Sequence, residues 1–344
     1  QSYLEGRSFS VAIERVSSKR CFLRIGVPQG SILGPILFIL YTKELNLIAE
    51  RHGLSIHLFA DDTQLYIEFN PLYQSIEDIE QKVVDCLQEI RLWMCANKLK
   101  LNPEKTEVLT VQTRNNFNTW TLESISLGGA QELTPSPVVK SLGVKLDSYL
   151  TFDEHIETIV KSCNIHLRNL GVIASKLSYE LKRQLIHCFI LSKLDYCNGL
   201  LVGQPDSSLR KLQKIQNSCA RFLFGNHGLK KWDSAMPLLK KAHFLPIKER
   251  IVYKIALLVF KCINNIAPKY LANCIRIKDQ PKKTLRTDMD YFLLHVPTLP
   301  NLQRTHRSFS QCAPSIWNSL PYYLRCHSDV GMFKKQLKTY LFEK

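Results

Sequence analysis

The chain has 344 residues, of which 45% are hydrophobic and 22% are charged, so it is long enough for two or three domains with ordinary globular cores. No apolar run approaches the ~20 residues that a membrane-spanning helix needs, and no charged-then-apolar leader begins the chain, so we expect neither a membrane protein nor a secreted one. The net charge of +16 instead favours a polyanionic partner.

The first predicted element is a β-hairpin. Phe9, Val11 and Ile13 alternate with polar residues, and residues 17–20 are expected to form a turn before the apolar residues 21–23. Because the chain begins with Gln1 in a segment that already has this strand pattern, we interpret it as a fragment or a truncated gene product.

A loop and an apolar helix are predicted next. Residues 26–30 contain two Gly and one Pro, a composition typical of a loop. We expect an apolar helix from Pro35 to about Ile48, because Pro is well tolerated in the first helical turn.

A second hairpin carries Asp61 and Asp62 at its predicted tip. Apolar residues alternate with polar ones on both sides, at positions 56 and 58 and at positions 65, 67 and 69. Adjacent carboxylates repel each other unless a cation offsets their charge, and magnesium prefers oxygen ligands of this kind. The pattern therefore favours Asp61 and Asp62 as metal ligands, with an ordinary Asp-Asp turn as the alternative. We expect Phe59 to pack beneath this hairpin.

The rest of the chain is predicted to become mainly helical. Ser75 and Asp78 form a capping box at the start of a helix that ends near Asn97, and residues 141–146 have the pattern of a strand and a turn. From Phe152 onward, apolar residues recur at helical spacing. Residues 278–305 are basic and aperiodic, which predicts a loop, and a helix is expected near the end of the chain.

Positive charge is concentrated in this helical part. Residues 1–160 contain 15 Lys or Arg and 20 Asp or Glu, a net charge of −5, whereas residues 161–344 contain 31 and 10, a net charge of +21. Nucleic acid is the favoured partner, because phosphate contacts by Lys and Arg dominate its binding. An anionic membrane surface is a weaker alternative, because no helix pairs a basic face with exposed Trp or Phe.

The cysteines do not suggest a disulfide framework. There are eleven, an odd number, and none forms a C-x-x-C pair, so we expect a reducing compartment, the nucleus or the cytoplasm. A zinc site from His306, Cys312, Cys326 and His327 is an alternative, although its spacing matches no standard pattern.

Several motifs resemble those of the non-LTR (LINE-type) retrotransposon reverse transcriptases. GVPQGSILGP at residues 26–35, followed by FADD at residues 59–62, resembles their central palm signature. Residues 97–106 and residues 142–144 resemble the next motif and the primer grip, in the same order. Residues 194–198, 215–217 and 313–321 resemble the tail of vertebrate-type LINE elements, so the resemblance covers nearly the whole chain.

The resemblance implies an α+β fold and an RNA-directed DNA polymerase. Residues 1–150 would form part of the palm, an antiparallel sheet with packed helices. Residues 151–235 would form a helical thumb, and residues 236–344 a basic, mainly helical C-terminal region. The implied partners are an RNA template, a DNA primer and dNTPs, and the implied cofactor is a pair of Mg²⁺ ions.

The resemblance also implies roles for individual residues. Asp61 and Asp62 match the catalytic aspartates that bind the metals. Gln29 and Gly30 match residues that line the nascent base pair, although Gly30 alone would suggest a plain turn. Lys105 matches a lysine proposed to protonate or neutralise the leaving pyrophosphate, with a solvated loop lysine as the alternative.

The basic helix of the implied thumb supplies candidate phosphate contacts. Arg210, Lys211 and Lys214 lie on one predicted helix, and an ordinary solvated helix face is the alternative interpretation of the same pattern.

One departure from the family pattern limits the expected activity. The family has a third catalytic aspartate upstream of the glutamine-containing loop, and the only acids before that loop here are Glu5 and Glu14. We therefore expect the chain to be inactive as a polymerase by itself, because two carboxylates would bind the metals weakly. The alternatives are a non-enzymatic nucleic-acid-binding remnant or domesticated element, and a group II intron maturase, which lacks support in the tail motifs.

Overall fold

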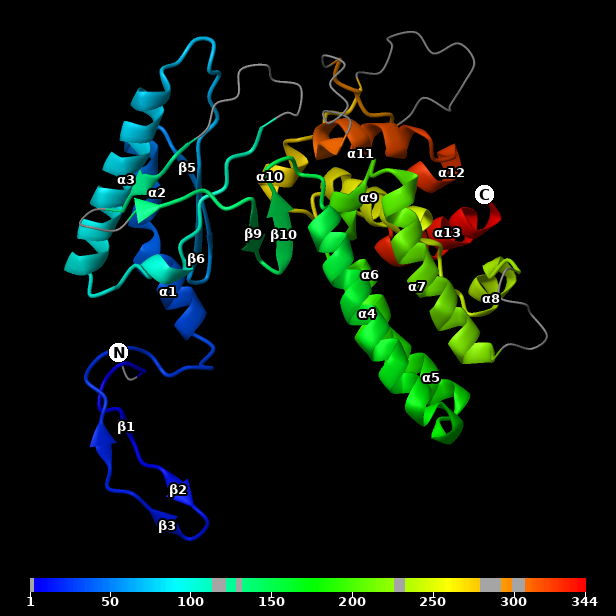
Figure 1. Cartoon of the computed structure of the whole chain (residues 1–344), viewed down its shortest axis with the longest axis horizontal. Helices are drawn as coiled ribbons and strands as arrows, with labels where there is room; N and C mark the ends of the chain where they lie inside the picture. The colour runs from blue at the N-terminus through cyan, green and yellow to red at the C-terminus, as the bar shows by residue number, and fades with distance from the viewer. Residues whose placement is uncertain (1–2, 113–121, 128–131, 226–232, 279–291, 299–306) are drawn as a thin grey trace. The chain divides into compact units, whose positions relative to one another are not determined.

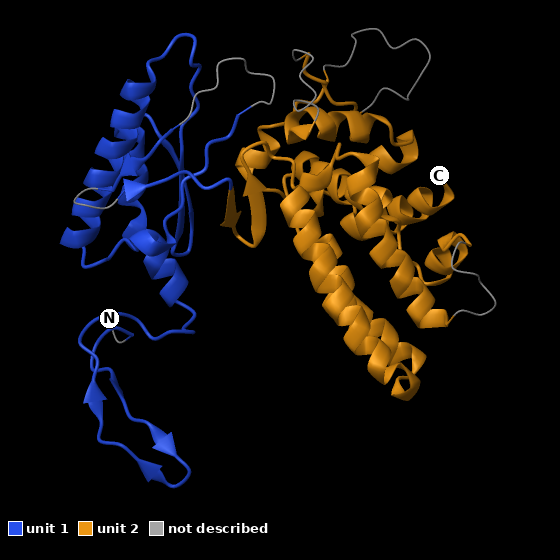
Figure 2. Cartoon of the chain, viewed as in Figure 1, with its two compact units in different colours: residues 1–137 blue, residues 138–344 orange. Residues whose placement is uncertain are grey.

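A computed structural model describes residues 3–112, 122–127, 132–225, 233–278, 292–298 and 307–344. The chain divides into two compact units, Gln1–Pro137 and Val138–Lys344 (Figure 2). Both contain helices and short antiparallel hairpins, so the α+β class is confirmed. None of the helices in the described part of the chain combines the length and apolar character required to cross a bilayer.

The N-terminal hairpin is present, but its turn differs from the prediction. The strands pair Ser8 with Phe22 and Ile13 with Val16, which leaves a two-residue turn at residues 14–15 rather than at residues 17–20. The reason is that Ser18 belongs to the ladder, where its backbone N–H donates to the Val11 carbonyl at 2.8 Å. The strands are β1 (Ser8–Phe9), β2 (Ala12–Ile13), β3 (Val16–Ser17) and β4 (Cys21–Phe22).

The second hairpin of the first unit rests on two helices. The predicted apolar helix is divided at Lys43 into α1 (Gly34–Thr42) and α2 (Glu44–Arg51). Helix α3 (Ile76–Ala96) begins as predicted, with Ser75 Oγ accepting from the Asp78 N–H, and it ends at Ala96 with Asn97 as the C-cap residue. Helices α2 and α3 lie beside strands β5 (Ser55–Phe59) and β6 (Asp62–Tyr66) (Figure 1). A small core forms there from buried residues of the two helices and of the turn before β5: Leu45, Ile48, Ala49, Leu54, Cys86 and Ile90.

Much of the remaining apolar surface of the first unit is exposed. In α1, only Gly34 and Thr42 are buried, whereas Ile36, Ile39 and Leu40 are 53%, 57% and 63% exposed. A helix that is apolar on all sides is typical of a buried position in a larger assembly. The unit also contains the 3₁₀ turn η1 (Pro103–Lys105) and the paired strands β7 (Ile125–Ser126) and β8 (Glu132–Leu133).

The second unit begins with a hairpin that leads into a helical core. Strands β9 (Val138–Ser141) and β10 (Val144–Asp147) are joined by a turn with positive φ at Leu142 and Gly143. The Asp147 carboxylate then accepts hydrogen bonds from the backbone N–H groups of residues 149, 151 and 152, which fixes the start of the next helix. Helices α4 (Asp153–Ile173) and α7 (Asp206–Phe224) pack together as the centre of this core (Figure 1).

A second core closes the C-terminal part of the unit. Trp317 is buried beside Phe333, which stacks on Phe260 with ring centroids 4.3 Å apart. The remaining elements are η2 (Ala174–Lys176), α5 (Tyr179–Ile186), the π-helical turn η3 (His187–Leu191), α6 (Ser192–Asp195), η4 (Asn198–Leu201), α8 (Met236–Lys241), α9 (Ile247–Ile263), α10 (Lys269–Ala272), α11 (Phe309–Asn318), α12 (Tyr322–Arg325) and α13 (Val330–Glu343).

The division into domains at residues 150 and 235 remains a prediction. The first core of the second unit runs from Val144 to Ile251, and the second core begins at Leu245. Most of the predicted loop at residues 278–305 lies outside the described residues.

Candidate functional site

The two adjacent aspartates lie at the tip of the β5–β6 hairpin. Phe59 pairs with Asp62, so residues 60 and 61 form a two-residue turn, in which Ala60 has a φ of 54°. Both carboxylates are exposed. The alternating pattern thus correctly predicts the hairpin and the place of the acidic pair in it.

The two faces of this hairpin have different environments. Ile56, Leu58 and Leu65 pack against the core formed by α2 and α3. On the opposite face, the ring of His57 stacks on Tyr66, whose hydroxyl lies 3.2 Å from His57 Nε2. Asp62 shares this outer face, which places one of the two carboxylates beside polar and aromatic side chains rather than apolar ones.

The expected position of Phe59 beneath the hairpin is wrong. Its side chain is 65% exposed, because its pairing with Asp62 places both residues on the face that points away from the core. An alternating pattern predicts which residues share a face, and Phe59 belongs with His57 rather than with Leu58.

The hairpin tip offers two carboxylates to a metal. Neither the Asp61 carboxylate nor the Asp62 carboxylate makes a hydrogen bond or an ion pair with another described residue. Exposed carboxylate oxygens suit Mg²⁺, which keeps several of its waters. In the described part of the chain, no group of three His, Cys, Asp or Glu residues could hold a metal, so no third side chain of these types joins the pair there.

The alternative zinc site does not form among the described residues. His306 lies outside them, and His327 Nε2 is 2.6 Å from Gln336 Oε1. Cys312 is buried in the C-terminal core, and among the residues that the structure describes no group of three His, Cys, Asp or Glu could hold a metal.

The predicted base-pair residues lie on an exposed turn before α1. Gln29 and Gly30 occupy this turn, and Gly30 has a φ of +81° with open space where a Cβ would be. The backbone conformation at position 30 therefore explains why the residue there is a glycine. Gly34 differs, because a Cβ there would lie 2.8 Å from Ser31 Oγ.

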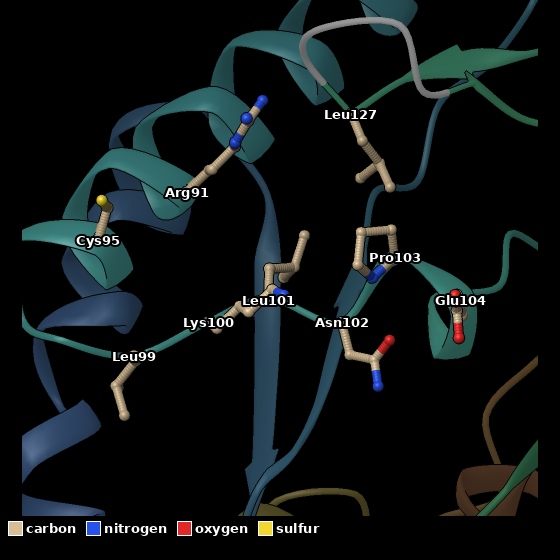
Figure 3. Close-up of a pocket in the computed structure, with 9 residues that line it drawn as sticks. All are labelled: Arg91, Cys95, Leu99, Lys100, Leu101, Asn102, Pro103, Glu104 and Leu127. Carbon is tan, nitrogen blue, oxygen red and sulfur yellow. The ribbon is translucent and has the colours of Figure 1, made fainter.

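The segment 97–106 borders a pocket on the first unit. It starts at Asn97, whose carbonyl accepts a hydrogen bond of 2.5 Å from the Tyr41 hydroxyl of α1. Figure 3 shows residues 99–104 along one side of the pocket, with Arg91 and Cys95 of α3 on another. The pocket has a volume of about 690 Å³ and is lined by Arg91, Cys95, Leu99, Lys100, Leu101, Asn102, Pro103, Glu104 and Leu127.

Lys105 lies on η1 next to this pocket but does not line it. Its side chain is exposed, and no described contact joins it to Asp61 or Asp62. The structure therefore brings the two aspartates together at the tip of one hairpin. The other predicted site residues lie on two different exposed segments, Lys105 on η1 and Gln29 and Gly30 on the turn before α1.

The predicted phosphate contacts lie on the exposed face of α7. Arg210, Lys211 and Lys214 are all exposed, whereas the opposite face of the helix is buried against α4. Lys211 Nζ lies 3.3 Å from Glu157 Oε1 in an ion pair that is about half exposed on both sides. Surface pairs of this kind contribute little stability, so Lys211 can exchange its partner for a phosphate at low cost.

The motif at residues 194–198 has a structural partner that the sequence does not identify. The Tyr196 hydroxyl donates a hydrogen bond of 2.6 Å to the Leu142 carbonyl, at the turn between β9 and β10. Its ring would lie 3.4 Å from a Cβ on Gly143. Tyr196 therefore holds the turn that resembles a primer grip, across 54 residues of sequence.

The other tail motifs also form structural contacts. The Gln216 side chain is fully buried, and its Nε2 donates to the Leu245 carbonyl at 2.6 Å. Asn318 pairs with the backbone of Leu294, accepting its N–H at 2.9 Å and donating to its carbonyl at 2.8 Å. These residues close the helical cores, so their presence in motifs is explained by folding.

Comparison with known proteins finds a family model and several relatives that match this chain. Residues 1–146 match the family model of the reverse transcriptases (RNA-dependent DNA polymerases). The curated relatives include the "RNA-directed DNA polymerase from mobile element jockey" of Drosophila funebris, which is 26% identical over 233 residues, 65% of this chain. No solved structure matches the chain with statistical support.

Two further relatives come from Drosophila melanogaster. The "Probable RNA-directed DNA polymerase from transposon BS" is 28% identical over 232 residues, 64% of this chain. The "Probable RNA-directed DNA polymerase from transposon X-element" is 28% identical over 233 residues, 65% of this chain. The chain spans 24% of the length of each of these three relatives.

Proposed function

Because residues 1–146 belong to the reverse transcriptase family and the chain is related to LINE-type retrotransposon polymerases, we propose that it is the segment of an RNA-directed DNA polymerase that carries the catalytic hairpin. The observation that carries this proposal is the pair of exposed carboxylates, Asp61 and Asp62, at the tip of a hairpin supported by a packed core. A rigid base keeps such ligands at a constant separation, which metal binding requires.

Asp61 and Asp62 would hold two Mg²⁺ ions, which when bound activate the attacking hydroxyl and neutralise the leaving pyrophosphate. Gln29 and Gly30 would line the nascent base pair, where the open space around Gly30 allows close approach of a nucleotide. Lys105 would protonate or neutralise the pyrophosphate, which its exposed position at η1 permits.

The second unit would hold the RNA template and the DNA primer. It contains 33 Lys or Arg and 14 Asp or Glu, a net charge of +19. We place phosphate contacts at Arg210, Lys211 and Lys214, exposed residues of α7 of which Lys211 lies at the edge facing α4, beside Glu157. The implied place of action is the nucleus or the cytoplasm, where such a template is found.

A second candidate function is nucleic-acid binding without catalysis. This second function is favoured because no third carboxylate joins Asp61 and Asp62 among the described residues. Two carboxylates alone would hold the metals weakly. We propose that the 344-residue chain by itself does not extend a primer, and that a polymerase requires a further carboxylate from another polypeptide segment.

Primer extension on a complemented protein tests the proposal. An upstream palm segment of a related element is joined to the chain, and extension of a DNA primer on an RNA template is measured with Mg²⁺. We expect extension that is lost in Asp61→Asn and in Asp62→Asn. The matched control is Asp85→Asn, the same change on the exposed surface of α3, which should retain extension.

The results separate the two functions. Extension that survives both hairpin variants would refute the catalytic role of the aspartates. Absence of extension in every complemented protein, with RNA binding retained, would leave nucleic-acid binding as the function.

A further inference from the structure

Two phenylalanines at the C-terminal end of α7 each have a lysine from another helix beside the ring. Lys182 of α5 has its Nζ 5.6 Å from the centroid of the Phe222 ring. Lys241 of α8 has its Nζ 4.8 Å from the centroid of the Phe224 ring. Both helices pack against α7, and Figure 1 shows them beside its C-terminal end. The contacts therefore hold two ammonium groups at one end of one helix.

A tyrosine belongs to the same group of side chains. Tyr179 begins α5, and its ring packs on Phe224 with centroids 5.6 Å apart and an angle of 36° between the planes. Phe224 is buried, so it supports both the Tyr179 ring and the Lys241 ammonium. Tyr179 precedes Lys182 by three residues, which makes them neighbours on the surface of α5. We call Tyr179, Lys182 and Lys241 the tip site.

The lysines of the tip site keep their charge available for a ligand. Their partners are neutral rings, and no described carboxylate forms an ion pair with Lys182 or Lys241. Arg250 differs, because it donates two hydrogen bonds, of 2.8 and 2.7 Å, to the Asp195 carboxylate. A ring orients an ammonium group without neutralising it, so the N–H groups can still donate to an anion.

The surroundings of the tip site are basic and open to solvent. Residues 174–186, 218–225 and 233–243 together contain six Lys or Arg and two Asp or Glu, a net charge of +4. Lys241 is exposed, and the Tyr179 side chain is 41% exposed although it packs on Phe224. An anion can therefore reach the lysines while a planar group covers the free part of the Tyr179 ring.

These features fit a single strand of nucleic acid. Such a strand alternates phosphates, which lysines bind, with bases whose faces stack on aromatic side chains. In a duplex the bases are already paired and stacked on one another, so they are not free to cover a tyrosine. The combination of a half-exposed ring with cations on both neighbouring helices thus favours an unpaired strand over a paired one.

We propose that the tip site binds an unpaired segment of RNA, with a base on the Tyr179 ring and backbone phosphates on Lys182 and Lys241. The site uses none of the α7 residues assigned above. It rests on the proposed function only for the identity of the nucleic acid.

Substitution of the tyrosine tests the stacking position in the full-length chain, without any polymerisation step. Tyr179→Leu keeps an apolar side chain against Phe224 but has no ring, so it should bind a short single-stranded RNA about tenfold more weakly. Tyr179→Phe keeps the ring and should bind as the unmodified chain does. Binding to paired RNA of the same length should be unchanged in Tyr179→Leu. The matched control is Tyr270→Leu, at an exposed tyrosine on α10, which should retain its affinity for the single strand.

Substitution of the lysines tests the phosphate contacts. In Lys182→Gln combined with Lys241→Gln, the dependence of log affinity on log salt concentration should become shallower by about 0.7 for each phosphate that is no longer neutralised. The control, Lys269→Gln combined with Lys335→Gln, removes the same charge from exposed positions on α10 and α13 and should leave the slope almost unchanged.

The outcomes separate this site from the proposed function. Equal weakening in Tyr179→Leu and Tyr270→Leu would refute the site, as would equal changes of slope in the two lysine variants. Vesicles of phosphatidylserine that bind in a manner dependent on Tyr179, with RNA binding that is independent of it, would assign the site to a membrane surface and overturn the proposal. Failure of the unmodified chain to bind RNA would refute the proposed function together with the site.

Photocrosslinking tests the site without any variant. Single-stranded RNA that contains 5-iodouridine is irradiated with the full-length chain, and the crosslinked residues are identified by mass spectrometry. We expect crosslinks at Tyr179 in preference to Tyr270, because the crosslink requires the base to contact the ring. Crosslinks at Tyr270 with none at Tyr179 would contradict the proposal.

Discussion

The two units differ in where they place their apolar side chains. In the first unit, α1 and the hairpin before it expose apolar residues, and a small core lies beneath the acidic hairpin. In the second unit, the same residue types fill two larger cores that run through α4, α7, α9 and α13. The difference indicates that the helical unit can fold on its own contacts, whereas the surface near the aspartates is suited to cover by another polypeptide surface.

The largest expected effect is a cavity in the C-terminal core. Phe333→Ala removes a fully buried ring that stacks on Phe260, so the unfolding free energy should fall by about 3–5 kcal/mol. Met332→Ala, at the neighbouring half-exposed position on α13, should change it by less than about 0.5 kcal/mol. Urea denaturation followed by circular dichroism measures both, and similar values for the two variants would contradict the described core.

Much of the fold could be predicted from local patterns, and the long-range contacts could not. The spacing around Asp61 and the cap at Ser75 predicted a hairpin and a helix that the structure contains. The sequence predicted the turn of the N-terminal hairpin at residues 17–20, but it lies at residues 14–15. The prediction failed because Ser18, a residue type common in turns, pairs within the ladder instead. The role of the Asp195 carboxylate depends on Arg250, 55 residues away, and periodicity carries no information about such a pair. The functions of the candidate site residues remain predictions.

The second effect compares two ion pairs on the same helix. Arg250→Gln leaves the Asp195 carboxylate without its bidentate partner, which should cost about 2 kcal/mol of stability. Lys248→Gln removes a pair with Asp206 that is more than half exposed on both sides, and it should cost less than about 0.5 kcal/mol. Urea denaturation compares the two, and equal costs would show that burial does not distinguish them.

The third effect is a dependence of stability on pH at the start of the helical unit. Burial alone would raise the pKa of Asp147, but hydrogen bonds from residues 149, 151 and 152 lower it below its ordinary value of 3.8. The stability it contributes is therefore present above that value and is lost as the pH falls through the folded-state pKa. Asp147→Asn should cost about 1–2 kcal/mol at neutral pH and progressively less below about pH 4. A constant difference across that range, measured by thermal melting, would contradict this account.

The smallest effect concerns the turn between β9 and β10. Tyr196→Phe removes the hydrogen bond to the Leu142 carbonyl, so the unfolding free energy should fall by about 0.5–1 kcal/mol. Amide hydrogen exchange at residues 141–145 should become faster. Tyr323→Phe, at a tyrosine with nearly the same exposure, is the control. Unchanged exchange in Tyr196→Phe would show that the hydroxyl does not hold this turn.

The central claim is that the tip of the β5–β6 hairpin binds the catalytic metals, and paramagnetic Mn²⁺ tests it most directly. Mn²⁺ added to the full chain should broaden the NMR signals of residues 59–63 before other signals, because Asp61 and Asp62 supply the oxygen ligands there. Asp61→Asn combined with Asp62→Asn should abolish this broadening, and Asp85→Asn should leave it unchanged. Broadening centred elsewhere, or equal broadening in the double variant, would contradict the claim.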